Sequence, residues 1–225
     1  MFLIFLVVIN TIGIIDDLIE KYEEILEKIT QWRKLKFSLN SKFDFRKYEN
    51  LKDLLKFQHG WQPSKDFHIY ENKKGYIRFI QNRDYSTSNH ITYIPKNRLI
   101  KTCGKEDIIM DKYGDAGKVR FGLEGAYNVA LMKIIPKEKE HKEYIRDFLN
   151  TEFIYLTLKN SSIASTRNSL NEKHFNCIKI PMLNKKDFLK YEFQLNSILK
   201  NYLLIKDKIE RLTNIKHILL NKYFK

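Results

Sequence analysis

The residue types that carry out most enzyme chemistry are present, but they do not form a recognisable catalytic pattern. Cys103 and Cys177 are far apart in the chain, and the six histidines show no metal-ligand spacing. The acidic residues Asp66 and Glu71 lie too close together in the sequence for the two strands that usually carry a nuclease site. No glycine loop followed by Lys-Ser or Lys-Thr is present, and neither are the Asn-Pro-Pro-aromatic or Asp-Pro-Pro-Tyr tetrapeptides of amino-methyltransferases. We expect no catalytic residue, no metal and no cofactor.

The sequence instead concentrates cationic and amide side chains in segments that are expected to be loops. Lysines and hydroxyls suit phosphate contacts, whereas Arg, Asn and Gln can read base edges through paired hydrogen bonds. For each residue alone, a solvated surface position is the alternative interpretation. The candidate DNA-binding residues are Lys73, Lys74, Arg78, Gln81, Asn82, Arg83, Asn89, Lys112, Tyr113, Lys118, Arg120, Ser165, Thr166, Arg167 and Asn168.

The overall charge agrees with a polyanionic partner. Forty-one Lys and Arg against 27 Asp and Glu leave a net charge of +14 in 225 residues. Nucleic acid is the commonest partner of such a chain, and a solubility surface is the alternative. Hydrophobic residues at 43% and aromatic residues at 13% are enough to form a core. The two separated cysteines fit a reducing, cytoplasmic setting.

The apolar start, MFLIFLVVINTIGII, has neither the positive region nor the small-residue cleavage site of a signal peptide. It is also shorter than the roughly 20 apolar residues that are needed to span a bilayer. We favour the start of a helix that a partner covers, with no membrane association. A membrane anchor is the alternative.

Two long helices are predicted from apolar residues that recur at alternating steps of three and four, the seam of a coiled coil. The first helix should cover about residues 6–37, and the second should follow residue 185. The expected seam residues are Ile12, Ile15, Ile19, Tyr22, Leu26 and Ile29 in the first, and Leu195, Ile198, Tyr202, Ile205, Ile209 and Leu212 in the second.

The two helical stretches also resemble each other, since a shift of 186 positions places Asn10 on Asn196 and Leu26 on Leu212. We interpret this similarity as a weak internal repeat. Two such helices would bury most apolar surface by packing antiparallel. The alternative is two ordinary amphipathic helices that pack on the domain between them.

The region between the helices predicts one mixed α and β domain. YIRFIQNRDYS, NHITYIP and FNCIKIPM are typical of strands, and DIIMDKYGDAGKVRFGL alternates strand-like positions with glycines. EYIRDFLNTEFIYLTLKN is expected to form one helix with Tyr144, Phe148, Phe153 and Leu156 on its apolar side. The predicted fold class is therefore α+β. The expected boundaries are 1–40 for the first helix, 41–184 for the domain and 185–225 for the second helix.

The order of these features resembles one known family. FQHGWQPSKDF leads through GYIRFIQNRDYS to DIIMDKYGDAGKVRFGLEGAYNVALMKIIP, and then to ASTRNSLNEKHFNCIKIPML and a terminal heptad helix. This order is similar to that of the specificity subunits of type I restriction-modification systems. IGIIDDLIEKYEEILEKI also resembles the conserved helix of that family. Full-length members carry two target recognition domains and two conserved helices, so this chain resembles one half of such a subunit.

The resemblance implies a non-catalytic subunit that reads one half of a bipartite DNA site. Its helices would dock the modification (methyltransferase) subunit and the restriction subunit, and a second copy or another half-subunit would supply the missing half. Two alternatives to this interpretation are a coiled-coil adaptor without specific DNA binding and an inactive relic of a specificity subunit.

Overall fold

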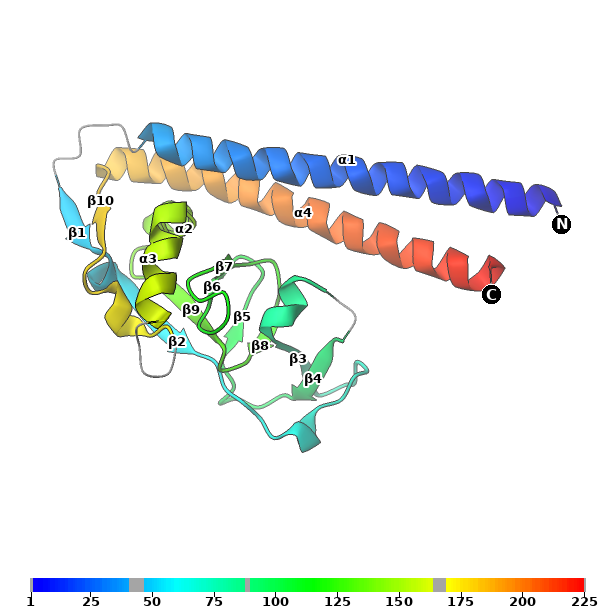
Figure 1. Cartoon of the computed structure of the whole chain (residues 1–225), viewed down its shortest axis with the longest axis horizontal. Helices are drawn as coiled ribbons and strands as arrows, with labels where there is room; N and C mark the ends of the chain where they lie inside the picture. Colours follow the sequence, from blue (N-terminus) through cyan, green and yellow to red (C-terminus); the bar gives the residue numbers. More distant parts are fainter. Residues whose placement is uncertain (1, 41–46, 88–89, 164–168, 225) are drawn as a thin grey trace. The chain divides into compact units, whose positions relative to one another are not determined.

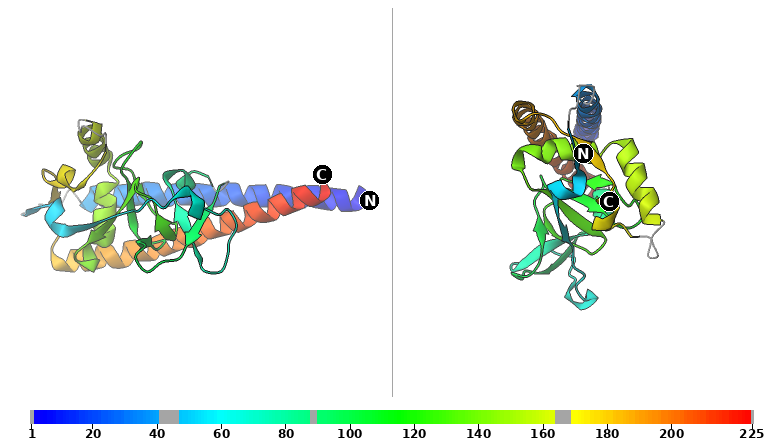
Figure 2. Two further views of the ribbon diagram at one scale, coloured as in Figure 1. Left: turned by 90° about the horizontal axis from the view of Figure 1, so that it is seen from below. Right: turned by 90° about the vertical axis from the view of Figure 1, so that its left-hand side faces the viewer.

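A computed structural model describes residues 2–40, 47–87, 90–163 and 169–224 of the chain. The chain divides into two compact units. The helical unit consists of Met1–Lys36 and Gln194–Lys225, and the mixed unit consists of Phe37–Phe193. Two 39-residue helices, α1 (Phe2–Asn40) and α4 (Lys185–Tyr223), form the helical unit (Figures 1 and 2). Residues 37–40 of α1 and 185–193 of α4 belong to the mixed unit. This arrangement confirms the predicted α+β fold class.

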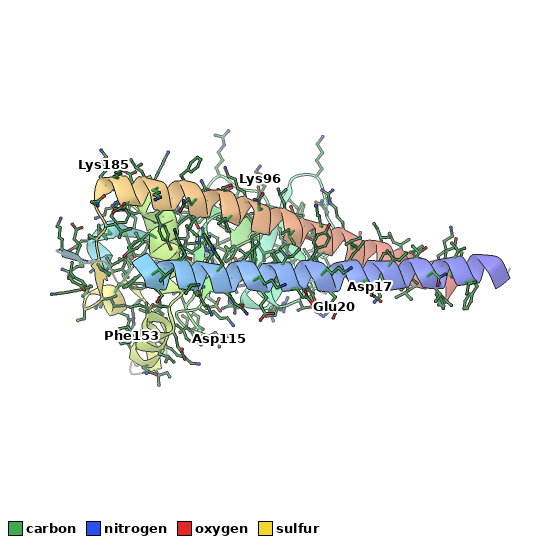
Figure 3. All side chains as sticks on the ribbon, turned by 90° about the horizontal axis from the view of Figure 1, so that it is seen from above. Asp17, Glu20, Lys96, Asp115, Phe153 and Lys185 are labelled. Atoms are coloured by element: carbon green, nitrogen blue, oxygen red, sulfur yellow. The ribbon has the colours of Figure 1, made fainter. Side chains whose placement is uncertain are left out.

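The two helices of the helical unit run antiparallel and lie side by side (Figures 1 and 3). In the first half of α1, Asp16 Oδ1 accepts a hydrogen bond from Lys216 Nζ at 2.6 Å. Toward its other end, Arg33 donates to the carbonyl oxygen of Leu195 at 3.4 Å. Early residues of one helix therefore meet late residues of the other, which is the arrangement that the apolar seams require.

None of the twelve predicted seam residues is exposed. Leu199 and Leu203 of α4 are buried as well, although the three-four pattern assigned them no place in the seam. Ile15 and Leu195 are buried, and the half-buried members are Ile12, Ile19, Tyr22, Leu26, Ile29, Ile198, Tyr202, Ile205, Ile209 and Leu212.

Among the described residues, the mixed unit contains two four-stranded sheets and one two-stranded sheet. Strands β3 and β8 pair in parallel, and every other pair of neighbouring strands is antiparallel. The first large sheet has the order β2 (Leu55–His59), β9 (Leu131–Pro136), β6 (Ile108–Asp111), β7 (Val119–Arg120). The second has the order β4 (Thr92–Pro95), β3 (Tyr76–Ile80), β8 (Gly125–Tyr127), β5 (Thr102–Cys103). The small sheet pairs β1 (Tyr48–Asn50) with β10 (Lys179–Pro181).

One apolar cluster joins the two large sheets. Ile80, Cys103 and Tyr127 come from the second sheet, and Ile109 and Leu131 come from the first; all five are at most 3% exposed. The Tyr127 hydroxyl satisfies its hydrogen-bonding need by donating to Gln58 Oε1 at 2.9 Å. The loops at the ends of both sheets are therefore held by a shared core.

Short 3-10 turns connect the strands. In the turn that begins after Asn171, the Asn171 side chain accepts from the Lys173 backbone N–H at 3.0 Å, as an N-cap should. The turns are η1 (Leu51–Leu54), η2 (Lys65–Phe67), η3 (Asn82–Tyr85), η4 (Lys139–His141) and η5 (Glu172–Phe175).

The single helix predicted for residues 143–160 is wrong, because two helices are present. Helix α2 (Lys142–Leu149) ends at Asn150, and α3 (Glu152–Ile163) begins after Thr151. The Thr151 hydroxyl donates to the carbonyl of Phe148 at 2.8 Å and also lies 3.5 Å from the Ile154 backbone N–H, so this side chain ends one helix and begins the next. The apolar stripe breaks at the same point, and Phe153 is left 76% exposed.

Buried polar contacts connect α2 to the first turns of α4 within the mixed unit. Tyr191 donates to Asp147 at 2.7 Å, and a Glu192 carboxylate oxygen accepts from the backbone N–H of Glu143 at 2.8 Å. Glu143 is itself fully buried and paired with Arg146 at 3.0 Å. Helix α4 therefore begins on a rigid part of the mixed unit.

No helix in the described part of the chain is long and apolar enough to cross a membrane.

Candidate nucleic-acid interface

The β6–β7 hairpin is shaped by one internal ion pair. Arg120 donates through Nε and one terminal nitrogen to Asp111 Oδ2, at 3.1 and 2.8 Å. Asp111 is only 1% exposed, and its burial raises the pKa of the carboxyl group, which the Arg120 hydrogen bond partly offsets. Asp115, in the turn of the hairpin, lies 3.8 Å from the same guanidinium. Arg120 therefore holds the loop that carries Lys112, Tyr113 and Lys118.

The same guanidinium also connects this hairpin to a second loop. It lies 5.6 Å from the centre of the Tyr85 ring, and Tyr85 ends η3. Turn η3 is built by a capping box in which Asp84 Oδ2 accepts from the Gln81 backbone N–H at 3.0 Å. Asp84 is buried, and this burial raises its pKa. Two loops that carry predicted DNA-binding residues thus lie next to each other, with Arg120 between them.

Several residues of this group are used inside the protein as well as at its surface. The Gln81 amide donates to Thr92 at 3.5 Å, and Arg78 is half-buried on β3, where its Nε has no hydrogen-bond partner among the described residues. Arg83 and Lys118 are exposed, and each lies near an acidic neighbour, at 3.8 Å from Asp84 and 3.3 Å from Asp115 respectively. Arg83 and Lys118 are therefore well placed for solvent-side contacts, whereas Arg120 and Gln81 position the loops.

Lys73 and Lys74 lie apart from this group, although both are exposed. They belong to the turn that precedes β3, in which Gly75 adopts a φ of +88°. Turn η3 follows the other end of β3, so the five-residue strand separates the two places by about 16 Å at 3.3 Å per residue. The structure therefore divides the described predicted residues between two cationic regions of the mixed unit, the turn before β3 and the pair of loops at η3 and the β6–β7 hairpin.

Five of the predicted residues, Asn89, Ser165, Thr166, Arg167 and Asn168, lie outside the described residues. The described Leu170 nevertheless donates its backbone N–H to the carbonyl of Lys112 at 3.0 Å. The chain therefore returns to the β6–β7 hairpin just after the segment 164–168.

Sequence reasoning missed a further set of cations. Lys65, Lys96, Arg98 and Lys101 are all exposed, and each lies within two residues in the chain of a residue that lines a small apolar pocket on the mixed unit. The signal was present in KNRLIK, where three cations occur within six residues.

Among the described residues, no group of three or more His, Cys, Asp or Glu side chains could hold a metal ion.

A comparison with protein families identifies what this arrangement is similar to. Residues 46–218 match the model of the type I restriction modification DNA specificity domain. The chain belongs to this family. The match covers most of the mixed unit and most of α4. No curated protein matches the chain.

Solved structures of specificity subunits share the fold. The S subunit of a type I restriction-modification system from M. genitalium matches with a TM-score of 0.65 and 16% identity, over 96% of this chain and 59% of that one. The HsdS subunit from Thermoanaerobacter tengcongensis matches with a TM-score of 0.51 and 13% identity, over 95% and 56%. A chain from a study of type I system assembly and conformational transition matches with a TM-score of 0.52 and 13% identity, over 99% and 58%. The specificity chain described here thus spans a little more than half the length of these relatives.

Proposed function

We propose that this specificity domain reads one half of a bipartite site in double-stranded DNA, for methylation and cleavage that other subunits carry out. The observation that carries the proposal is the family match across the domain and α4. The placement of η3 against the β6–β7 hairpin supports it, because two loops with exposed Arg and Lys side chains and the half-buried Asn82 could enter a major groove together. We expect this function to be carried out in the cytoplasm.

The proposed division of labour follows from the residue types. Arg83 and Asn82 at η3 would contact base edges, whereas Lys73, Lys74 and Lys118 would contact phosphates. The net charge of +14 would supply most of the sequence-independent affinity. Tyr113 and Lys112 belong to the same hairpin, and the Lys112 ammonium lies 5.7 Å from the Tyr113 ring centre.

The helical unit would dock the methyltransferase and restriction subunits or a second copy of this chain. A second apolar stripe on α1 supports this role, because it is exposed and repeats with heptad spacing. Ile14, Leu18 and Ile25 each precede a seam residue by one position, which turns them by about 100° around the helix from the seam. The other three members lie a whole number of heptads from Ile14 or Ile25, so they are on the same side of the helix. The stripe consists of Val7, Ile14, Leu18, Ile25, Trp32 and Leu35, which are 39–61% exposed.

The decisive experiment is co-purification of the chain with the methyltransferase subunit, followed by mapping of methylated bases in the host genome. We expect a methylated bipartite motif that disappears when this gene is deleted. If the chain co-purified with the methyltransferase subunit but no methylated motif depended on this gene, the chain would be a protein-binding adaptor or an inactive relic instead.

A second measurement tests DNA contact directly. Binding of the chain to duplex DNA should weaken steeply with salt, and Lys74→Ala should reduce the slope of log K against log salt by about 1. Lys34→Ala on α1 is the matched control, because it removes an exposed lysine from the helical unit. If Lys74→Ala and Lys34→Ala had equal slopes of log K against log salt, the turn before β3 would not be part of the DNA interface.

A further inference from the structure

The mixed unit has an apolar pocket that the DNA-reading loops described above do not use. It is lined by Trp61, Pro63, Phe67, Ile94, Pro95 and Ile100, with Asn97 as the only amide. Its volume is about 190 Å³. Pockets for drug-sized ligands measure about 300–1,000 Å³, so this pocket suits a single ring system.

The walls of the pocket are fixed by backbone contacts. The Trp61 N–H donates to the carbonyl of Tyr127 at 3.1 Å, which attaches this wall to β8. Ile69 and Tyr93 exchange two backbone hydrogen bonds, at 3.0 and 2.8 Å, which attach the segment after η2 to β4. The backbone on two sides of the pocket is therefore held by hydrogen bonds within the mixed unit.

Two aromatic walls remain half open to solvent. Trp61 is 49% exposed and Phe67 is 53% exposed, although both are large apolar side chains. Such side chains offer flat faces on which another ring can stack. Asn97 adds polar capacity, because its Oδ1 accepts from the Leu99 N–H while its amide nitrogen has no partner among the residues the structure describes.

The charge around the pocket indicates which ring would enter. Lys65, Lys96, Arg98 and Lys101 each lie within two residues of a lining residue in the chain, and no ion pair involves any of them in the described part of the structure. Asp66 is the only carboxylate so placed, and it accepts from the Ser64 hydroxyl at 2.8 Å. Four cations against one carboxylate favour an anionic ligand with a flat apolar part.

The pocket is also continuous with one of the two cationic places. Lys96 donates its backbone N–H to the carbonyl of Gly75 at 2.8 Å, which places it beside the turn that carries Lys73 and Lys74. A DNA backbone that follows those lysines would therefore pass the mouth of the pocket.

We propose that this pocket takes one unstacked nucleobase of the DNA, with the flanking phosphates on the surrounding cations. This inference rests on the proposed function, because it takes DNA as the ligand. Extrusion of a paired base costs a few kcal/mol, whereas stacking on an aromatic side chain returns about 1–3 kcal/mol per base. The pocket is therefore filled where a base is already unpaired, and it remains open on an intact duplex.

The test compares three DNA probes that carry the same sequence: a fully paired duplex, the duplex with a one-nucleotide bulge, and the duplex with an abasic nucleotide in that bulge. The test uses the full-length chain with the substitution Trp32→Phe. Of the two tryptophans in the sequence, only Trp61 then remains. We expect the base-containing bulge to quench Trp61 fluorescence and to bind about fivefold or more tightly than the abasic bulge.

Two variants complete the test. Trp61→Ala should abolish the difference between the two bulges, while Tyr70→Ala, which removes a 70% exposed aromatic residue that does not line the pocket, should leave it unchanged. The comparison of Trp61 fluorescence with the two bulged probes uses a chain whose pocket residues are unchanged. It therefore remains decisive if Trp61→Ala does not fold.

Equal binding and equal quenching by the two bulges would overturn the pocket assignment, and salt-dependent binding of the paired duplex would then leave the proposed function standing. Failure of all three probes to bind would overturn both. Quenching of Trp61 by the methyltransferase subunit without any response to DNA would identify a protein contact and overturn the nucleobase proposal.

Discussion

Arg120, which was predicted to contact DNA, makes its contacts inside the protein. Its guanidinium is shared by Asp111, Asp115 and the Tyr85 ring, so it fixes two loops at once. Arg120→Ala would leave the Asp111 carboxylate buried without its partner. We expect the free energy of unfolding to fall by about 3 kcal/mol, measured by urea denaturation.

The matched control for Arg120→Ala is Arg98→Ala, because Arg98 is exposed and no ion pair involves it among the described residues. Its free energy of unfolding should change by less than about 0.5 kcal/mol. The double variant Asp111→Asn with Arg120→Met should recover much of the loss, since it removes the buried charge as well as its partner. Equal losses for Arg120→Ala and Arg98→Ala would show that the pair does not stabilise the hairpin.

Residue types alone could predict which side chains are candidates for contacting DNA, but not which of them already form ion pairs or hydrogen bonds inside the protein. Asp111 and Arg120 are nine residues apart, and they meet only because β6 and β7 pair in a hairpin. The pocket was missed for the same reason, since Trp61 and Ile100 are brought together by the backbone contacts between segments. The two long helices α1 and α4, in contrast, were predictable because their apolar spacing is local, whereas the break between α2 and α3 depends on the Thr151 side chain.

At the scale of elements, the glycine of the GWQPS segment has a specific packing role. The Gly60 N–H donates to the carbonyl of Leu131, and a Cβ at Gly60 would lie 1.9 Å from the carbonyl oxygen of Asn128. The backbone at the end of β2 must therefore move if any side chain is added. Gly60→Ala should lower the free energy of unfolding by about 2 kcal/mol or more, measured by thermal or urea denaturation.

Gly104→Ala is the control for Gly60→Ala within the same unit. A Cβ there meets only Asp107 Oδ2, at 3.9 Å, which is ordinary contact. The stability of Gly104→Ala should therefore differ little from that of the parent chain. A Gly60→Ala variant as stable as the parent would show that the β2 end is not packed as described.

The connection between α2 and α4 makes the stability of the mixed unit depend on pH. Burial raises the pKa of Glu192 above 4.5, with Glu143 as a further cause and the Glu143 backbone N–H opposing it. The folded state therefore holds this proton more tightly than the unfolded state. The resulting loss of stability is fully present when the pH is above the pKa of Glu192 in the folded state. It disappears as the pH falls to the pKa of this group in the unfolded state.

Glu192→Gln removes this charge but keeps an oxygen that can accept from the Glu143 N–H. We expect its melting temperature to exceed that of the parent by about 1–3 °C at pH 7, with no difference below about pH 4.5. Glu210→Gln, at an exposed position on the same helix, should show no such difference. A lower melting temperature at pH 7 would show that the Glu192 carboxylate stabilises the connection.

At the scale of the whole molecule, the exposed α1 stripe connects the proposed function to oligomeric state. A two-fold dimer would bury the same stripe on both copies, and it would present two identical reading domains to DNA. The methylated motif would then be a palindrome with a gap at its centre.

Leu18→Glu places a charge in the middle of this stripe, where Leu18 is 39% exposed. Because both copies lose an apolar contact, we expect the dimer dissociation constant, measured by sedimentation, to rise about tenfold or more. The same variant should lose the gapped palindrome from the methylated bases of its host. Leu99→Glu makes the same exchange at an 83% exposed position of the mixed unit, and it should leave the dimer intact. A monomer at all concentrations, or a methylated motif with two different halves, would instead mean that another chain supplies the second reading domain.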